Sequence, residues 1–406
     1  MKKYLIIILV IFLTGSTYLS GAEDKKPAEK NEKMKPVVRA AKIISKLDVR
    51  SPGTPSYIKR KQRIIRQLRK ISKSSKSEIQ KKYFGTVIKC FKDEKFDALP
   101  EVEFISGTQS DLLIKYHRKN KALFAIALRS PVEQNKTIED LFDKIRNEIE
   151  KGILGRNIRF FPQSNVIKIS EVIYPETLDK RVIVLPSSEA ALGMYPGVIL
   201  LKNRIEKDFE NIIKPLSRQI LKKKISDGLN AGLLSRNIFL HHVAHFTIPF
   251  SIKKDGEKRE FKDAGLKDLF SDAEEIRADL NYLKLISLLD EKELLEEGVK
   301  EEVLYIFLLQ KMAEMNGKDR SRANHPSTAI INSLYKRGGL GTDKNGKKLV
   351  VDIDLLVRNI KSLEIAFEDI FQKGNHGECK IFFKKYSKIP ENLKKLLKIS
   401  ISKKTE

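Results

Sequence analysis

The spacing of apolar positions divides the chain into two parts of different character. Beyond residue 202, apolar residues recur every three or four positions, the spacing of helices that bury one face. These helical runs cover residues 205–224, 229–246, 266–289, 300–315, 326–337 and 352–372. Between about residues 83 and 201 the apolar stretches are short and rich in β-branched residues, which is typical of strands. The pattern predicts an α+β fold in which a mixed α/β part precedes a predominantly helical part.

The mixed part contains one clear hairpin signal. Residues 112–114 with Tyr116, and residues 122–128, are apolar and flank a polar turn, so we expect them to pair as antiparallel strands. Residues 182–185 and 198–201 predict two further short strands. A basic helix over residues 57–83 is expected to pack against this part. The predicted lobes are therefore residues 57–201, with the helix and the sheet, and residues 202–406, which are helical.

The first 22 residues have the pattern of an export signal. Lys2 and Lys3 precede ten uninterrupted apolar residues, and the segment ends on small residues at positions 20–22. We expect cleavage after Ala22 and export to the periplasm or the medium. The apolar run is shorter than the ~20 residues of a membrane span, so no span is expected after cleavage. Retention of the segment as an N-terminal anchor is the alternative.

Residues 23–36 are mainly Lys, Glu, Pro and Asn, a composition that favours disorder. We therefore expect residues 23–56 to form a disordered basic tether. The whole chain carries a formal charge of +26, and loss of residues 1–22 with their two Lys leaves 77 − 53 = +24. Such a charge attracts anionic surfaces. Because Arg and aromatic residues are not interleaved, specific nucleic-acid binding is not expected. We expect the charge mainly to reflect composition and a solvated surface, and a functional anion-binding face is the alternative.

Candidate chemistry lies in the helical part. His241 and His245 are four residues apart in a predicted helix, which places them on one face, and Glu275 can approach them from a second helix. Two imidazoles and one carboxylate form the protein shell of a catalytic zinc site. Asp279, one turn after Glu275, can accept the free N–H of a ligating histidine. The alternative is a chance cluster of histidines beside ordinary surface carboxylates. Only Cys90 and Cys379 are present, which excludes a disulfide framework and leaves their pairing open.

These segments, in their order along the chain, resemble the dipeptidyl peptidase III family of zinc peptidases. The resemblance covers roughly residues 180–395. It is carried by Val184-Leu185-Pro186, Val198-Ile199-Leu200-Leu201-Lys202-Asn203, Phe209, Lys214-Pro215, the histidine motif at 241–245, Leu269 to Asp279, Asn324-His325, Tyr335 to Gly339 and Val351-Asp352. It implies a two-lobed molecule with a cleft between the mixed lobe and a helical zinc lobe. It further implies that His241, His245 and Glu275 bind zinc, that Asp279 supports them, and that His325 polarises the substrate.

The sequence departs from the family pattern at three places. His242 stands where zinc peptidases of the His-Glu-x-x-His type carry the glutamate that activates water. Ser187-Ser188 replaces an Asn-Asp pair, and residues 246–249 replace a Gly-rich continuation of the metal helix. A neutral His242 can accept a proton in place of the glutamate, or could serve as a third imidazole ligand, although neighbouring helical positions point about 100° apart.

Two functions of different classes follow from these observations. The first is an exported zinc-dependent metallopeptidase that hydrolyses peptides by metal-activated water, with activity weakened or altered by the loss of the glutamate base. The second is a catalytically inactive relative that binds peptides or acts as an interaction protein of the cell envelope.

Overall fold

The structure, a computed structural model, describes residues 27–100, 112–129, 142–151, 158–160, 166–185, 197–254, 257–260, 265–291, 295, 297–315 and 325–402, except residues 76, 118, 119, 144, 179 and 250. The expected export signal and Ser187-Ser188 lie outside the described residues. No described helix is long and apolar enough to cross a membrane.

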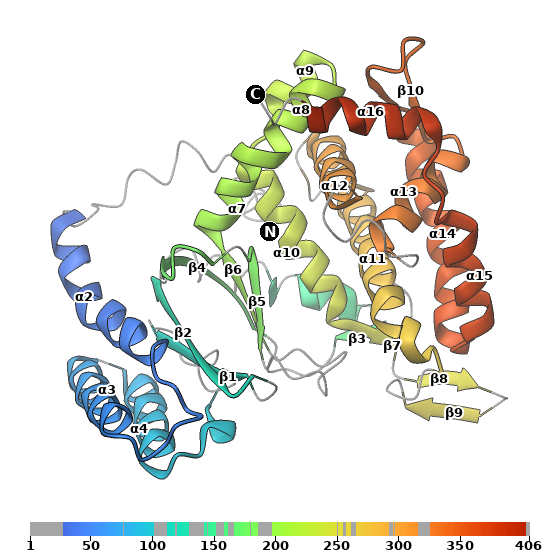
Figure 1. The fold of residues 1–406 in the computed structure, drawn as a ribbon. Coiled ribbons are helices and arrows are strands. Elements are labelled where there is room, and N and C mark those ends of the chain that lie inside the picture. Colours follow the sequence, from blue (N-terminus) through green and yellow to red (C-terminus); the bar gives the residue numbers. More distant parts are fainter. Residues whose placement is uncertain are drawn as a thin grey trace.

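Three helices open the described chain and pack together on one side of a sheet (Figure 1). They are α2 (Pro27–Ile44), α3 (Pro55–Ser74) and α4 (Glu78–Asp93). The expectation of a disordered tether over residues 23–56 is therefore wrong from Pro27 onward. Val37, Ala40 and Ile44 recur at helical spacing and are buried against the sheet, and this apolar face outweighs the disorder-favouring composition before it.

The single helix expected over residues 57–83 is two helices. The side chain of Thr54 caps the first helix by accepting from the backbone N–H of Tyr57, and Ser77 caps the second by accepting from Gln80. Hydroxyl residues satisfy the free N–H groups at helix starts, so Ser77 defines a new beginning within an otherwise continuous helical pattern.

A five-stranded sheet forms the centre of the mixed lobe. Its order is β1-β2-β4-β6-β5, and all neighbouring strands are antiparallel except β4 and β6. The hairpin expected from the sequence is confirmed, with Leu112 opposite Ala127. The strands expected over residues 182–185 and 198–201 are also confirmed, whereas β4 was missed. Their bounds are β1 (Leu112–His117), β2 (Ala122–Arg129), β4 (Val166–Tyr174), β5 (Val182–Leu185) and β6 (Gly197–Leu201).

The sheet separates two hydrophobic cores. Along β6, Val198 and Leu200 belong to the core of the helical lobe, while Ile199 and Leu201 belong to the core beneath the N-terminal helices. Successive side chains of a strand point to opposite faces, so a strand that is apolar at every position is buried on both sides. β6 therefore joins the two lobes.

The helical lobe follows directly from β6. The run expected over residues 205–224 is divided, because a π-helical turn, η3 (Phe209–Ile213), interrupts it. The other expected helices are present, and α15 and α16 were missed. The helices are α7 (Lys202–Asp208), α8 (Lys214–Ile220), α9 (Lys223–Gly228), α10 (Ala231–His245), α11 (Phe270–Glu291), α12 (Val299–Met315), α13 (Pro326–Lys336), α14 (Ile353–Lys373), α15 (His376–Tyr386) and α16 (Glu391–Ser402).

Short elements complete the described chain. Three two-stranded pairs are formed by β3 (Ile158–Phe160) with β7 (Thr247–Pro249), β8 (Ser251–Lys254) with β9 (Glu257–Glu260), and β10 (Leu340–Thr342) with β11 (Leu349–Val351). Single 3₁₀ turns are η1 (Phe96–Ala98) and η5 (Lys267–Leu269). Cys90 and Cys379 are both free and buried. The architecture confirms the α+β class expected from the sequence.

Candidate metal centre

Two helices of the helical lobe supply the candidate ligands. Asn230 caps α10 by accepting from the backbone N–H of Leu233, and the helix ends at His245, immediately before β7. α11 packs beside α10 and is buried around most of its circumference. Because so little of α11 faces solvent, its buried carboxylates require charged or hydrogen-bonding partners.

The structure brings His241, His245 and Glu275 together, as the helical spacing predicts. The Nε2 atoms of the two imidazoles are 3.0 Å apart. The carboxylate of Glu275 lies 3.3 Å from Nε2 of His241 and 3.6 Å from Nε2 of His245. One potential ligand atom of each residue lies within 4.8 Å of the others. The side chain of Glu275 is 45% exposed, so the group opens toward solvent on one side.

Two further carboxylates hold the far sides of the imidazoles. Asp279 lies 2.8 Å from Nδ1 of His241, and Glu274 lies 3.1 Å from Nδ1 of His245. An ionised carboxylate only accepts hydrogen bonds, so each Nδ1 carries the proton and each neutral imidazole has its lone pair at Nε2. Both lone pairs then point at each other and toward the Glu275 carboxylate. Such an arrangement repels itself unless a proton or a metal cation lies between the donors.

The spacing of the three donors fits zinc. Zn–N and Zn–O bonds of about 2.0–2.1 Å in a tetrahedral site place neighbouring ligand atoms about 3.3–3.4 Å apart. Here the two Nε2 atoms are 3.0 Å apart, Oε2 of Glu275 lies 3.3 Å from Nε2 of His241, and its Oε1 lies 3.6 Å from Nε2 of His245, so each imidazole faces one oxygen of the carboxylate. Histidine ligands that donate their other N–H to a carboxylate are the usual arrangement around protein-bound zinc. His241, His245 and Glu275 therefore fit a zinc ion both in distance and in chemistry.

The role of Glu274 could not be separated from that of Glu275 in the sequence. The carboxylate of Glu274 accepts two hydrogen bonds from Arg277, one from Nε and one from a terminal nitrogen, each at 2.6 Å. This arginine is 1% exposed. Arg277 also donates to the backbone carbonyls of Thr247 and Ala244, just after and within the histidine segment. The pair thereby ties the end of α10 to α11. The sequence signals this role only through the presence of a second glutamate, Glu274, beside Glu275.

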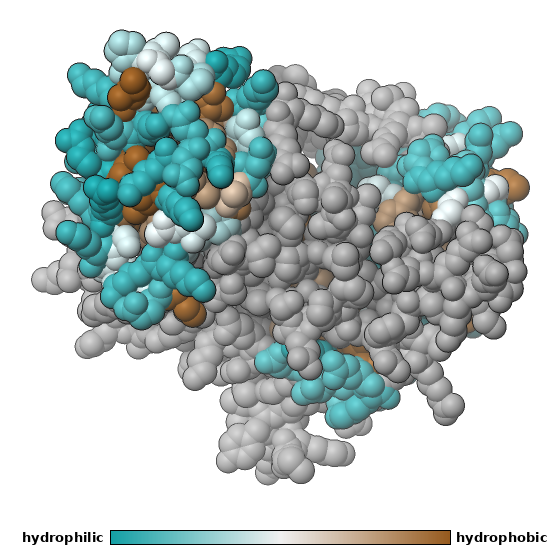
Figure 2. Space-filling view, turned by 90° about the horizontal axis from the view of Figure 1, so that it is seen from below, coloured by the Kyte–Doolittle hydropathy of each residue, from teal (hydrophilic) through white to brown (hydrophobic). Residues whose placement is uncertain are grey.

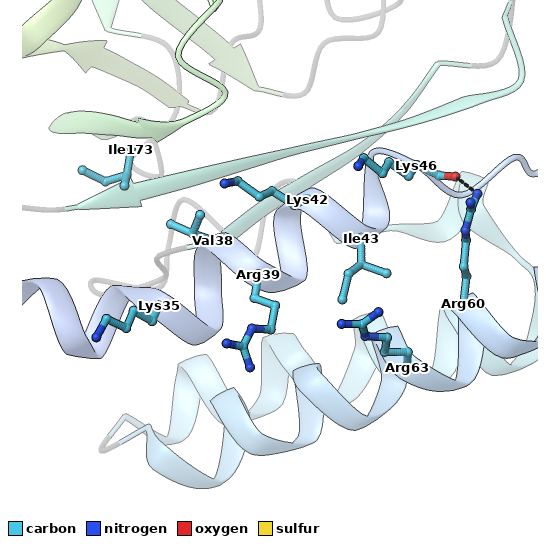
Figure 3. A pocket seen from close by; sticks show the side chains of 9 residues that line it. All are labelled: Lys35, Val38, Arg39, Lys42, Ile43, Lys46, Arg60, Arg63 and Ile173. Carbon is cyan, nitrogen blue, oxygen red and sulfur yellow. Dashed lines mark hydrogen bonds between the residues drawn. The ribbon is translucent and has the colours of Figure 1, made fainter.

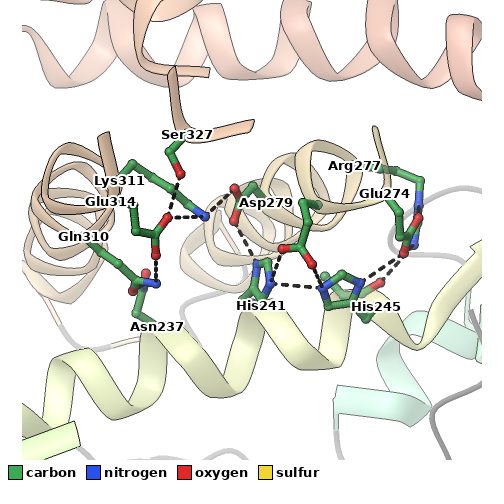
Figure 4. Close-up of polar contacts among 12 residues, drawn as sticks. Asn237, His241, His245, Glu274, Arg277, Asp279, Gln310, Lys311, Glu314 and Ser327 are labelled. Carbon is green, nitrogen blue, oxygen red and sulfur yellow. Dashed lines mark hydrogen bonds and ion pairs between the residues drawn. The ribbon is translucent and has the colours of Figure 1, made fainter. Parts of the chain in front are cut away.

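A chain of buried and half-buried charges extends from Asp279 through Lys311 to Glu314 (Figure 4), and continues from Glu314 to Arg181 beside the sheet. Lys311 on α12 lies 2.7 Å from Asp279 and 3.5 Å from Glu314. Glu314 is 3.4 Å from Arg181, which precedes β5 and also contacts Asp208 at 3.4 Å. The contact network thus joins both lobes to the candidate metal centre. Side-chain contacts from Gln310 and Ser327 complete the surroundings of Glu314, at 3.0 and 2.6 Å.

The formal charge of this network matches a divalent cation. The carboxylates are those of Asp208, Glu274, Glu275, Asp279 and Glu314, and the cations are Arg181, Arg277 and Lys311. With neutral imidazoles the sum is 3 − 5 = −2. Uncompensated charge is costly in a low-dielectric interior, so the network favours the uptake of positive charge.

In the metal-free protein, protons supply part of that charge. Burial alone would lower the pKa of His241, but the carboxylates of Asp279 and Glu275 outweigh it and raise the pKa to about 9. Burial acts against ionisation of Glu275 as well, yet His245 and His241 hold its pKa well below the ordinary value. Despite burial, Lys311 lowers the pKa of Glu314 to about 2. The carboxylates therefore stay ionised and available to a cation.

The two remaining sequence candidates lie differently. His242 is half-buried and is not part of the three-residue group; its ring centre is 5.3 Å from that of His241 and 5.7 Å from that of His245. Burial and the two neighbouring imidazoles hold the pKa of His242 well below its usual value. His325 directly precedes α13, and its side chain does not cap that helix. On α13, Ser327 contacts Glu314 of the buried network (Figure 4).

Comparison by sequence finds similarity over part of the chain. No family model matches the chain. A curated relative, Nudix hydrolase 3 from Arabidopsis thaliana, is 24% identical over 246 residues, which is 57% of this chain and 30% of that protein. The chain thus spans less than a third of this relative's length.

Two solved structures are similar over most of the chain. Dipeptidyl peptidase III from Caldithrix abyssi has a TM-score of 0.73 at 16% identity, covering 93% of this chain and 77% of that one. The corresponding enzyme from Corallococcus sp. strain EGB has a TM-score of 0.66 at 16% identity, covering 85% and 67%. The chain therefore has a fold like that of dipeptidyl peptidase III, as the resemblance in sequence implied.

Proposed function

We propose that the chain is an exported, zinc-dependent relative of the dipeptidyl peptidases that hydrolyses peptides, with activity weakened or altered by His242. The observation that carries the zinc assignment is the convergence of two Nε2 lone pairs and the Glu275 carboxylate, with each Nδ1 proton held by its own carboxylate. Support for peptides as substrates comes from the fold of the two solved dipeptidyl peptidases.

Each residue of the candidate metal centre has a role in this proposal. His241, His245 and Glu275 would hold the metal, and Asp279 and Glu274 fix the tautomer and orientation of the imidazoles. Bound zinc polarises a substrate carbonyl and lowers the pKa of a water molecule. The half-exposed side of Glu275 provides access for a substrate. His242 lies beside this group and is neutral at physiological pH, so it can accept a proton.

The lowered pKa of His242 also supports a second candidate function, a catalytically inactive protein that binds peptides. General bases work best when their pKa lies near the operating pH, and proton transfer by such a base contributes about 100- to 10,000-fold to a rate. A histidine with a strongly lowered pKa is a weak base. The two candidates therefore share the metal and differ in turnover.

Metal analysis of the purified chain tests the shared part. We expect about one zinc per chain after dialysis against zinc-containing and then metal-free buffer. His245→Ala and Glu275→Gln should reduce this occupancy strongly. His376→Ala is the matched control, because His376 contacts Asp268 on a different part of the lobe. Equal zinc content in all four proteins would exclude this site.

Peptide hydrolysis separates the two candidates. If the enzyme is weakened only by its missing base, His242→Glu should raise the rate on dipeptidyl substrates by about 100-fold or more, and His242→Ala should lower it. A zinc-loaded wild type without turnover, together with a His242→Glu variant that gains none, would favour the inactive peptide-binding protein. Equal rates in wild type and His242→Ala would exclude His242 as the base.

A further inference from the structure

The positive charge of the chain is concentrated in one layer of the fold. Residues 35–74, which form the second half of α2, the following turn and α3, contain 13 Lys and Arg and one acid, Asp48, a net charge of 13 − 1 = +12 out of +26. Asp48 contacts Arg50 at 3.0 Å. Figure 2 shows that the face formed by the N-terminal helices is largely hydrophilic, with scattered hydrophobic residues. The charge therefore forms a local cationic surface rather than a uniform bias.

This surface contains a groove between α2 and α3, with a volume of about 690 Å³ (Figure 3). Six cationic side chains line it, none of the nine lining residues is acidic, and Arg39 and Arg63 extend from opposite helices into the space between them. Arg60 donates to the backbone carbonyl of Lys46 at 2.6 Å, which fixes one end. The six cations are Lys35, Arg39, Lys42, Lys46, Arg60 and Arg63.

The remaining lining residues are apolar. Val38 and Ile43 come from α2, and Ile173 comes from β4. The lining of the groove therefore combines three apolar side chains with six cationic ones. Guanidinium groups bind phosphate through two parallel hydrogen bonds, and lysine binds it as a point charge. A ligand that carries phosphate beside an apolar stem fits both features.

Several observations favour an anionic membrane surface over nucleic acid. No aromatic residue lines the groove, whereas single-stranded nucleic acids are bound mainly by stacking on aromatic side chains. The apolar face of α3 is buried in the protein through Tyr57, Ile64, Leu68 and Ile71, and seven of its eight basic residues are exposed. Clusters of Lys and Arg on an amphipathic helix such as α3 are typical of binding to anionic lipids.

From these features, we propose that the groove between α2 and α3 binds the phosphate of anionic phospholipid headgroups and places the protein on a membrane leaflet. The groove is separate from the candidate metal centre, and the proposal does not depend on zinc or on peptidase activity. It applies whether or not residues 1–22 are removed, because every residue of the groove follows them in the chain.

The test uses residues 23–406 and co-sedimentation with vesicles. One vesicle contains phosphatidylglycerol and phosphatidylcholine at a ratio of 3 to 7, and the other contains phosphatidylcholine alone. The groove variant is Arg39→Gln, Lys42→Gln and Arg63→Gln together. A matched control, Arg218→Gln, Arg358→Gln and Lys384→Gln, removes the same charge from exposed positions of the helical lobe. Circular dichroism of all proteins verifies that the folds are equal.

We expect wild type and control to bind the anionic vesicles alike and the groove variant to bind about 100-fold more weakly, since each of the three Lys and Arg near the surface contributes about a fivefold gain in affinity. Neutral vesicles should bind none of the proteins. Equal losses in groove variant and control would overturn the proposal in favour of net charge. If wild type bound glycerophosphoglycerol more strongly than the groove variant did, while both bound the anionic vesicles equally, the proposal would be overturned in favour of a soluble phosphorylated ligand. Stronger binding to a 20-nucleotide DNA strand than to the anionic vesicles would overturn it in favour of nucleic acid.

Discussion

The proton held by His241 predicts how the stability of the metal-free protein depends on pH. His241 has a pKa of about 9 in the folded chain, raised from 6.5 against the effect of burial by the carboxylates of Asp279 and Glu275. Folding therefore favours the protonated imidazole. The associated stability is fully present below pH 6.5 and is lost as the pH rises toward 9.

The size of the effect follows from the shift. Each pH unit within this window is equivalent to about 1.4 kcal/mol, so the free energy of unfolding should fall by about 2–3 kcal/mol between pH 6.5 and 8.5. Above that range, thiols titrate as well. Burial raises the pKa of Cys379 to about 12, and this thiol ionises near pH 8.5 in the unfolded chain. The measurement should therefore end at pH 8.5.

Urea unfolding in EDTA, followed by circular dichroism because the chain has no Trp, measures this dependence. His241→Gln is the control, since it removes the titrating group and should flatten the curve over the same range. Saturating zinc should abolish the decline, because the metal replaces the proton. A metal-free wild type whose stability is constant or increases from pH 6.5 to 8.5 would refute the argument, as would an equal decline in His241→Gln.

Four further outcomes are expected. Zinc binding below pH 9 should release about one proton per site, which calorimetry in buffers of different ionisation enthalpy measures. The apparent affinity for zinc should therefore rise about tenfold per pH unit between pH 6 and 8. Asp279→Asn and Lys311→Met should each cost about 3–5 kcal/mol in urea unfolding, because each leaves a buried charge without its partner at 2.7 Å. The double variant should lose clearly less than the sum. Gly339→Ala should cost about 1–3 kcal/mol, because its Cβ would lie 2.9 Å from the backbone of α14, whereas Gly341→Ala, with open space around it, should change little.

Much of the fold could be predicted from local patterns. The hairpin and most helices of the second half follow from period-2 and period-3.6 spacing, which are properties of single segments. α2 could not be predicted because its apolar face is short and follows a highly polar stretch, and that face is buried by packing on α3 and β2, which lie elsewhere in the sequence. β4 was missed for a related reason. Its partners β2 and β6 are distant in sequence, and pairing over such separations has no local signal.

The candidate site was predictable where spacing along one helix decides geometry. His241 and His245 share a face by helical periodicity alone. The helix of Glu275 was recognised because its segment follows the histidine motif in the order that carries the resemblance to dipeptidyl peptidase III. The sequence could not show that Lys311 on α12 completes the environment of Asp279, because nothing in a sequence indicates which lysine becomes buried. Nor could it distinguish Glu274 as the partner of His245, since that role depends on the rotation of α11 relative to α10.

The net charge of the chain illustrates why composition alone was misleading. The value of +26 does not show where the charge lies, and +12 of it lies within residues 35–74. The groups joined around the candidate metal centre sum instead to −2 with neutral imidazoles. Screening reduces interactions between exposed charges beyond about 8–10 Å at physiological salt, so the two regions act on different ligands. Neutralising Arg39, Lys42 and Arg63 should therefore weaken vesicle binding without changing zinc occupancy, and Glu275→Gln should do the reverse. If either change altered both properties, the separation of the two electrostatic sites would be wrong.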